Sequence, residues 1–322
     1  MDTPLWRGSG LRFTGFGHYY PRTHVRNEAT EEVAGNAVDA AVIGRIEVRG
    51  RHVAEEDETV PEMARLAAAD ALADAGLEPG DIDLLILSNW TDRQFVPEHA
   101  PTAARLLGAD RALAFDVCGA CTGFVHGTQL AAALLKTTPH WTNALVVGAD
   151  RFSRRVRPGS KGGLIVGDAA GAAVLTRGEP DPAGRGLVDS LLISDGDGAG
   201  TVTVLPPNGW IKSDPKLVDI AVGAHETVAG TLLPRSGVKM ADVDWVVPHP
   251  GTGPMHSRIR EQLEIPEDRF VTNFEERGNT GSASIPIVLS EMAKDGRLRP
   301  GQLVLTPTVG SGWFYGGLLF HA

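Results

Sequence analysis

Apolar and polar residues group into blocks along the chain, and these blocks predict strands and helices in turn. Short runs rich in apolar residues, which are typical of buried strands, occupy residues 11–17, 81–88, 114–117 and 144–148. Stretches rich in Ala and Leu, which favour helix, occupy residues 59–75, 101–107 and 125–136. Thr59 and Glu62 have the spacing of a capping box, and Gly76 is the predicted end of that helix. The alternation predicts an α/β layered fold.

The order of these elements repeats in the second half of the chain. Three pairs of segments recur in the same order with offsets of 161, 158 and 159 residues: 76–86 with 237–247, 121–123 with 279–281, and 145–147 with 304–306. Nearly equal offsets in one order indicate duplicated halves. The Pro- and Gly-rich stretch 177–184 is the predicted linker, which divides the chain into residues 1–178 and 179–322. The turns that contain Cys121 and Asn279 are then equivalent, and we expect them to face each other across a pseudo-twofold axis.

Composition and charge narrow the class of protein. A chain of 322 residues is long for a single core, which favours two lobes, and its net charge of −10 argues against a nucleic-acid binder. Two cysteines are too few for a disulfide-stapled secreted protein, so we expect a reducing, cytoplasmic location. Residues 1–7 lack the apolar core of a signal peptide, and no apolar run approaches the length of a membrane-spanning helix.

Cys121 is the first candidate for chemistry, because it lies where a predicted strand passes into a predicted helix. Free N–H groups and the positive end of the dipole at a helix start favour a thiolate, which is the nucleophilic form of cysteine. Cys118 and Cys121 also have CxxC spacing, which admits a redox motif or zinc ligands. Zinc needs a second ligand pair that the sequence lacks. We therefore interpret Cys118 as a buried small apolar residue beside the nucleophile.

Two polar sites follow apolar segments in the second half. His249 comes just after the predicted strand 244–247, and Asn279 lies in a Gly-rich turn before the helix predicted around 287–290. Either residue alone is compatible with a purely structural role. In duplicated halves that also supply Cys121, the three residues form a Cys/His/Asn set suited to nucleophilic catalysis.

The motifs that contain these residues resemble the ketoacyl-ACP synthase III family of condensing enzymes in the thiolase superfamily, over nearly the whole chain. They are residues 115–124, 167–175, 248–249, 278–280 and 310–312. The resemblance implies a five-layered α-β-α-β-α fold, a homodimer, and a role in fatty acid or polyketide biosynthesis. It assigns the nucleophile to Cys121 and the two polar catalytic roles to His249 and Asn279.

The same resemblance implies a reaction. Cys121 takes an acyl group from an acyl-CoA or acyl-carrier-protein thioester, while the N–H groups of Cys121 and Ser311 hold the oxyanion. A malonyl-type thioester on a carrier protein then loses carbon dioxide and condenses with the acyl group. No metal or redox cofactor is needed. Two alternatives stay open: an acyltransferase that moves the Cys121-bound group to an O, N or S nucleophile, and a catalytically silent scaffold that binds carrier proteins.

Several positions bear on substrate binding. Arg45 matches the family's arginine beside the CoA adenine, whereas Ala41 stands where the family usually has a stacking tryptophan. Val309 stands where the family usually has a phenylalanine. The missing tryptophan weakens the case for a CoA donor and leaves room for an acyl group delivered on a carrier protein. Together, the differences favour a member that serves specialised metabolism, for example one that starts a polyketide.

Charged segments admit two interpretations each. Arg154 and Arg155 belong to a basic stretch that is either a solvated loop or, as we favour, a docking site for an acidic carrier protein and its phosphopantetheine arm. Residues 45–52 are either a solvated loop or a site for a phosphate-bearing ligand. Glu98 is either a solvated loop carboxylate, which we favour, or an additional base.

Overall fold

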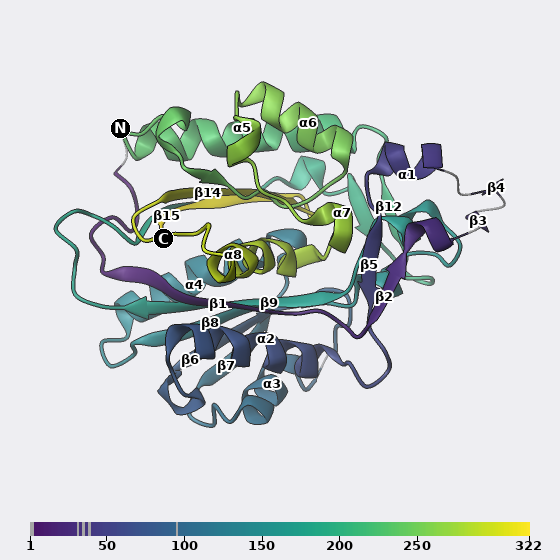
Figure 1. The fold of residues 1–322 in the computed structure, drawn as a ribbon. Coiled ribbons are helices and arrows are strands. Elements are labelled where there is room, and N and C mark those ends of the chain that lie inside the picture. The colour runs from purple at the N-terminus through teal and green to yellow at the C-terminus, as the bar shows by residue number, and fades with distance from the viewer. Residues whose placement is uncertain (1–2, 31, 34–35, 38–39, 95) are drawn as a thin grey trace.

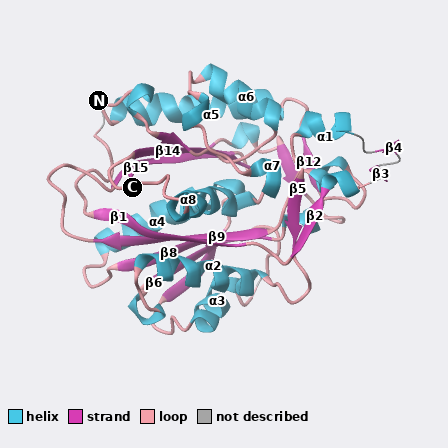
Figure 2. Cartoon of the chain, viewed as in Figure 1, coloured by secondary structure: helices cyan, strands magenta, loops and turns pink. Residues whose placement is uncertain are grey.

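Two β-sheets form the centre of the protein (Figures 1 and 2). The computed structural model describes residues 3–30, 32–33, 36–37, 40–94 and 96–322. The first sheet has the order β1-β9-β8-β6-β7 and consists of β1 (Leu11–Tyr19), β6 (Leu84–Ser88), β7 (Leu113–Val117), β8 (Asn143–Asp150) and β9 (Ala169–Arg177). The second has the order β10-β15-β14-β13 and consists of β10 (Leu187–Ser194), β13 (Trp245–Val246), β14 (Leu303–Gly310) and β15 (Phe314–His321).

Helices fill the space between the sheets and cover both outer faces (Figure 1). The inner layer is α4 (Gly123–Thr137) and α8 (Ser284–Lys294), and the outer layers are α2 (Val60–Ala75) with α3 (His99–Leu107), and α5 (Leu217–Arg235) with α6 (Gly253–Gln262). Side chains alternate along β8, so Val146 packs in the core with the inner helices and Leu145 packs with α2 and α3. The predicted five-layered α-β-α-β-α fold is confirmed.

Shorter elements lie at one end of these layers (Figure 1). They are β2 (Thr23–Arg26), β3 (Glu32–Val33), β4 (Asn36–Ala37), α1 (Ala40–Ile46), β5 (Gly50–Val53), β11 (Val202–Val204), β12 (Ile211–Ser213) and α7 (Phe274–Arg277). Strands β2 and β5 form one antiparallel ribbon and β11 and β12 another. Strand β12 brings residues of the second half to the functional cavity described below.

The sequence repeat corresponds to a repeated local structure. Gly76 and Gly237 each follow a helix with positive φ, +65° and +68°, a conformation that glycine adopts without strain. Asp81 and Asp242 each accept a hydrogen bond from the backbone N–H three residues earlier. The strands that follow, β6 and β13, each pair in parallel with a later strand, β8 and β14. Because α8 of the second half also packs on the first sheet, the division of the chain at residue 178 stays a prediction.

Two local expectations need correction. The strand predicted at 81–88 begins at Leu84, since Pro79–Asp81 forms a 3₁₀ turn instead. The capping box at Thr59 is wrong: its side chain makes no cap bond, and the Glu62 carboxylate pairs with Arg65 at 2.5 Å. Among the residues described, no helix has both the length and the apolar character needed to cross a membrane.

Candidate active site

Cys121 lies in a tight turn between β7 and α4. A 3₁₀ turn, Ala120–Thr122, joins the two elements, and Ala120 has a positive φ of +44°, which an L-residue with a side chain rarely adopts. The Thr122 hydroxyl donates to the Gly119 carbonyl oxygen at 2.6 Å. A side chain on Gly123 would collide with Ser88, so glycine lets the helix start lie against β6. The turn therefore holds Cys121 at the C-terminal edge of the first sheet.

The backbone fixes His249 and Asn279 beside each other. The His249 N–H donates to the Pro307 carbonyl of β14 at 3.0 Å. Asn279 donates its backbone N–H to Ile165 at 2.8 Å and accepts from Gly167 at 2.9 Å, which ties its turn to the first half of the chain. Its Oδ1 accepts from the Gly281 N–H at 3.0 Å, so Nδ2 points the other way and lies 3.5 Å from His249 Nε2.

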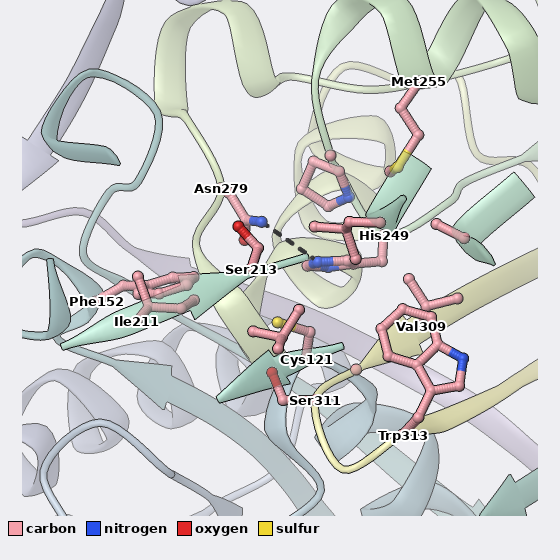
Figure 3. A pocket seen from close by; sticks show the side chains of 16 residues that line it. Cys121, Phe152, Ile211, Ser213, His249, Met255, Asn279, Val309, Ser311 and Trp313 are labelled. Carbon is pink, nitrogen blue, oxygen red and sulfur yellow. Dashed lines mark hydrogen bonds between the residues drawn. The ribbon is translucent and has the colours of Figure 1, made fainter. Parts of the chain in front are cut away.

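Cys121, His249 and Asn279 line one cavity of about 120 Å³ (Figure 3). The remaining lining is mostly apolar and consists of Phe152, Val202, Ile211, Ser213, Leu217, Ala221, Pro250, Gly251, Met255, Val309, Gly310, Ser311 and Trp313. The structure thus brings together the three residues that the sequence singled out from separate segments. It also places Val309 and Ser311 in the same lining.

The end of β14 approaches the backbone of the nucleophile turn. A Cβ built on Gly310 would lie 3.2 Å from the Cys121 nitrogen and 2.9 Å from the Thr122 nitrogen. Only a residue without a side chain permits this approach. Ser311, the next residue, therefore lies close enough to Cys121 for both to line the cavity.

Burial and a nearby carboxylate oppose ionisation of the thiol. Burial raises the pKa of Cys121, and the charge of Asp150 raises it further. This is opposite to the direction expected from the helix start alone. Burial also raises the pKa of Asp150, to about 6. The Asp150 carboxylate accepts from the Ser282 N–H at 2.9 Å and from its hydroxyl at 2.7 Å, and these bonds offset part of that shift.

His249 is neutral near pH 7. Burial lowers its pKa to about 3, with smaller contributions from His225 and His256. A neutral imidazole carries one N–H donor and one acceptor, and its charge does not enter the chemistry at that pH. With its proton on Nε2, the neutral His249 ring and Asn279 Nδ2 can both donate hydrogen bonds to an oxygen that gains negative charge.

Cys118 is exposed, so its interpretation as a buried apolar residue is wrong. The reason lies in the sheet order: β7 is an edge strand of the first sheet, and the residues after it have no neighbouring strand on that side. Cys118 and Cys121 are both free thiols. Cys121 alone of the two lines the cavity, which agrees with its choice as the candidate nucleophile.

The candidate binding residues other than Val309 lie outside that cavity, among the residues described. Arg154 pairs with Glu56 at 2.9 Å on the surface, and Arg155 donates to the Thr91 carbonyl oxygen. Arg45 and Ala41 are exposed on α1. These positions leave the proposed roles in carrier or CoA binding as predictions.

Other charged positions are paired within the protein. Glu98 is exposed and accepts a hydrogen bond from the Asp116 N–H at 3.1 Å, which agrees with a solvated loop carboxylate. In the basic segment 45–52, Arg49 pairs with Glu275 at 2.6 Å, and Arg51 donates to Asn27. Intramolecular pairing therefore accounts for these two cations.

Sequence reasoning missed three buried polar residues near the site: Asp150, His225 and His256. The sequence did contain a signal for Asp150, because this charged residue is the last position of the apolar run that forms β8. The two histidines lie in helices, where a single histidine gives no signal of burial. The apolar residues Met255 and Trp313, which line the cavity, were also missed.

Comparison with known proteins identifies the family. A profile described as 3-Oxoacyl-[acyl-carrier-protein (ACP)] synthase III matches residues 115–196, and the profile of its C-terminal part matches residues 233–322. Beta-ketoacyl-[acyl-carrier-protein] synthase III 3 of Streptomyces coelicolor is 35% identical over 319 residues, and the match covers 94% of each chain. The chain belongs to the 3-oxoacyl-[acyl-carrier-protein] synthase III family.

Solved structures of this family match the fold closely. The 3-oxoacyl-[acyl-carrier-protein] synthase III from Aquifex aeolicus has a TM-score of 0.91 at 31% identity, with 97% of this chain and 100% of the other covered. The priming β-ketosynthase of the R1128 polyketide pathway has a TM-score of 0.88 at 27% identity, with 100% and 98% covered. The protein is therefore a 3-oxoacyl-ACP synthase III-like enzyme, a transferase with the thiolase-like fold that the sequence predicted.

Proposed function

We propose that this enzyme transfers an acyl group from a thioester to Cys121 and then condenses it with a malonyl-type unit on an acyl carrier protein. The observation that carries the proposal is the convergence of Cys121, His249 and Asn279 on one cavity. Membership of the 3-oxoacyl-ACP synthase III family supports it, since the names of the relatives describe synthases that act with an acyl carrier protein.

In the first step the Cys121 sulfur attacks the carbonyl carbon of the acyl thioester. A new carbon–sulfur bond forms, the bond to the donor thiol breaks, and the proton of the Cys121 thiol leaves with the donor sulfur. Because the thiol has a raised pKa, this proton leaves as the attack proceeds rather than beforehand. The backbone N–H groups of Cys121 and Ser311 are the proposed donors to the oxyanion.

In the second step the malonyl thioester loses carbon dioxide, and its bonding electrons form an enolate. His249 and Asn279 donate hydrogen bonds to the thioester oxygen, where the negative charge develops. The enolate carbon attacks the acyl carbonyl on Cys121, and the carbon–sulfur bond to Cys121 breaks. The Cys121 sulfur takes up a proton, and a β-ketoacyl thioester leaves. Both steps are polar acyl chemistry, so they call for no redox cofactor or metal.

The cavity lining suggests the nature of the acyl group. Its polar groups gather around Cys121, His249 and Asn279, whereas Met255 and Trp313 present apolar surface (Figure 3). An apolar acyl chain buries such surface favourably. We keep delivery by a carrier protein, docking at Arg154 and Arg155, and a role in specialised metabolism as proposals. The two free cysteines fit the reducing cytoplasm that the sequence predicts.

We also propose a homodimer that forms along the edge of β7. This strand has a sheet neighbour on one side only, and Leu113 at its start is 50% exposed. Leu130 of the adjoining helix α4 is 41% exposed. An unprotected sheet edge with apolar side chains favours pairing with another strand.

Carbon dioxide release tests the proposed reaction. With an acyl donor and malonyl-carrier protein, we expect release by the wild-type enzyme together with a β-ketoacyl product. His249→Ala and Asn279→Ala should each reduce release by about 100-fold or more, since each removes a transition-state donor, while Cys121 still becomes acylated. Acyl transfer to another nucleophile without release of carbon dioxide would instead establish the acyltransferase alternative.

A further inference from the structure

A cluster of polar and aromatic side chains lies directly before the turn that contains Asn279. Its centre is Arg277, the last residue of helix α7. Arg277 does not line the cavity within the described part of the chain, so it acts on the reaction only through other residues. The other members of the cluster are Tyr20, His52, Asn273 and Glu291.

Three contacts hold the Arg277 guanidinium. Burial lowers the pKa of His52, so the ring is neutral near pH 7. His52 Nδ1 lies 2.6 Å from the Pro21 carbonyl oxygen, which only accepts, so Nδ1 carries the proton and Nε2 is an acceptor. Arg277 donates to this Nε2 at 3.1 Å. The guanidinium carbon also lies 4.3 Å from the centre of the Tyr20 ring, and Nε lies 3.8 Å from the Glu291 carboxylate. A planar guanidinium can donate in its plane and stack on its face at the same time.

The partners of Arg277 are themselves held in place. The Tyr20 hydroxyl donates to the Glu291 carboxylate at 2.6 Å, and the Asn273 amide donates to the same carboxylate at 2.8 Å. The rings of Tyr20 and His52 stack with their centroids 4.9 Å apart. Glu291 belongs to α8, which packs on β1 of the first sheet. These contacts give the Arg277 side chain a defined position.

The backbone transmits this position to Asn279. The Arg277 carbonyl packs against Gly167, where a built Cβ would lie 2.3 Å from the carbonyl oxygen. Gly167 donates its N–H to the Asn279 carbonyl oxygen at 2.9 Å. The next residue, Asp168, donates its N–H to the His52 carbonyl oxygen at 2.9 Å. His52 thus supports both the residue that leads into the turn and the segment with which the turn pairs.

We propose that Arg277 is a positioning residue, which aims the Asn279 amide at the oxygen of the malonyl thioester. Only Gly278 separates the two residues, and glycine adds little stiffness of its own. Asn279 Nδ2 lies 3.5 Å from His249 Nε2 at the cavity (Figure 3). A displacement of about 1 Å at such a group can slow a step about 100-fold. The proposal rests on the proposed role of Asn279 as a hydrogen-bond donor in the second step.

Replacing Arg277 separates this role from a general effect on folding. Arg277→Met keeps an unbranched side chain and removes its donors and its charge. We expect it to lower kcat for carbon dioxide release by about 10- to 100-fold, with unchanged KM for malonyl-carrier protein and unchanged acylation of Cys121. Glu276→Gln is the matched control, because it removes only a surface ion pair of the same helix, 2.9 Å from Arg26, and should leave both steps unchanged. Equal losses in both steps of Arg277→Met, or a wild-type kcat, would overturn the proposal.

His52 supplies a second pair of variants. His52→Phe keeps an aromatic ring beside Tyr20 but has no acceptor for Arg277, whereas His52→Gln keeps an acceptor oxygen. The phenylalanine variant should slow carbon dioxide release, and the glutamine variant should stay within about threefold of wild type. Combined with Arg277→Met, His52→Phe should cause no additional loss, because both changes break one interaction. Equal losses in the two His52 variants, or losses that add in the double variant, would contradict the proposal.

A crystal structure of Arg277→Met tests the positioning without an activity assay, and His52→Phe replaces it if that variant does not fold. We expect the Asn279 amide to lie farther from His249 than in the wild-type protein. An Asn279 amide in its wild-type position would refute the proposal even if the variant is slow. If the amide is displaced but the wild-type enzyme releases no carbon dioxide, the proposed reaction is refuted and the role of Arg277 in placing Asn279 stands.

Discussion

Asp150→Asn is a sensitive test of the electrostatics around Cys121. Asp150 is fully buried at the end of β8, and its pKa of about 6 compares with an ordinary value of 3.8. The difference of about 2 pKa units corresponds to about 3 kcal/mol. Because the pKa is raised in the folded state, the folded protein binds more protons than the unfolded chain between about pH 4 and pH 6. The free energy of unfolding therefore falls as the pH rises through that window, and asparagine abolishes this part of the decrease.

The substitution also has a cost that does not depend on pH. One carboxylate oxygen accepts from the Ser282 N–H and hydroxyl, and the other accepts from the Thr91 hydroxyl at 3.2 Å. The asparagine side chain has a single oxygen and leaves one set of donors unpaired, which costs about 1–3 kcal/mol. We expect the variant to be less stable than wild type at pH 4 and to recover most or all of that difference by pH 7.

Urea unfolding at a fixed protein concentration, between pH 4 and pH 7, measures the effect. The same variant should lower the pKa of the Cys121 thiol, since the Asp150 charge raises it. Alkylation of Cys121 by iodoacetamide should then be faster at a given alkaline pH. Both proteins need Cys118→Ala for this assay, because Cys118 is exposed and would react as well. A stability difference that does not change with pH, or an unchanged alkylation profile, would refute this account of Asp150.

Three further predictions follow from other contacts. Gly310→Ala places a Cβ against the backbone of Cys121 and Thr122. We expect it to slow acylation of Cys121 by about 100-fold or more, as measured by intact mass. An acylation rate equal to that of wild type would contradict the close approach of β14 to the nucleophile turn. Leu113→Arg puts a charge at the proposed β7 edge and should shift the mass in sedimentation toward the monomer, whereas an unchanged mass would rule out this interface. Arg154→Glu should raise KM for malonyl-carrier protein and spare acylation from a small thioester; an unchanged KM would show that Arg154, whose surface partner is Glu56, is not part of the docking site.

The sequence alone was sufficient to predict the layered fold and to predict that the three candidate catalytic residues lie together. Each of Cys121, His249 and Asn279 follows an apolar segment or begins a helix, and the repeat predicted that the turns of Cys121 and Asn279 face each other. Apolar periodicity and turn residues act over a few positions, so they can be recognised in one sequence. The motifs that contain the three residues then supported the family, which the comparisons show.

Features that depend on distant parts of the chain could not be predicted in this way. Cys118 is exposed because β7 lies at a sheet edge, and the order of strands is not written in any one segment. The carboxylate of Asp150 meets Ser282, which is 132 residues away, and Arg154 meets Glu56, which is 98 residues away. His225 and His256 sit on helices whose buried faces become evident only once α5 and α6 pack against the second sheet.

The central claim is that Cys121 carries the acyl group, and intact mass measurement tests it most directly. Wild type and the matched variants Cys118→Ala and Cys121→Ala are incubated with a panel of acyl-CoA and acyl-carrier thioesters. We predict a mass increase equal to one acyl group in wild type and in Cys118→Ala, none in Cys121→Ala, and loss of the adduct with release of carbon dioxide when malonyl-carrier protein is added. An adduct that persists in Cys121→Ala, or that forms on Cys118, would contradict the account.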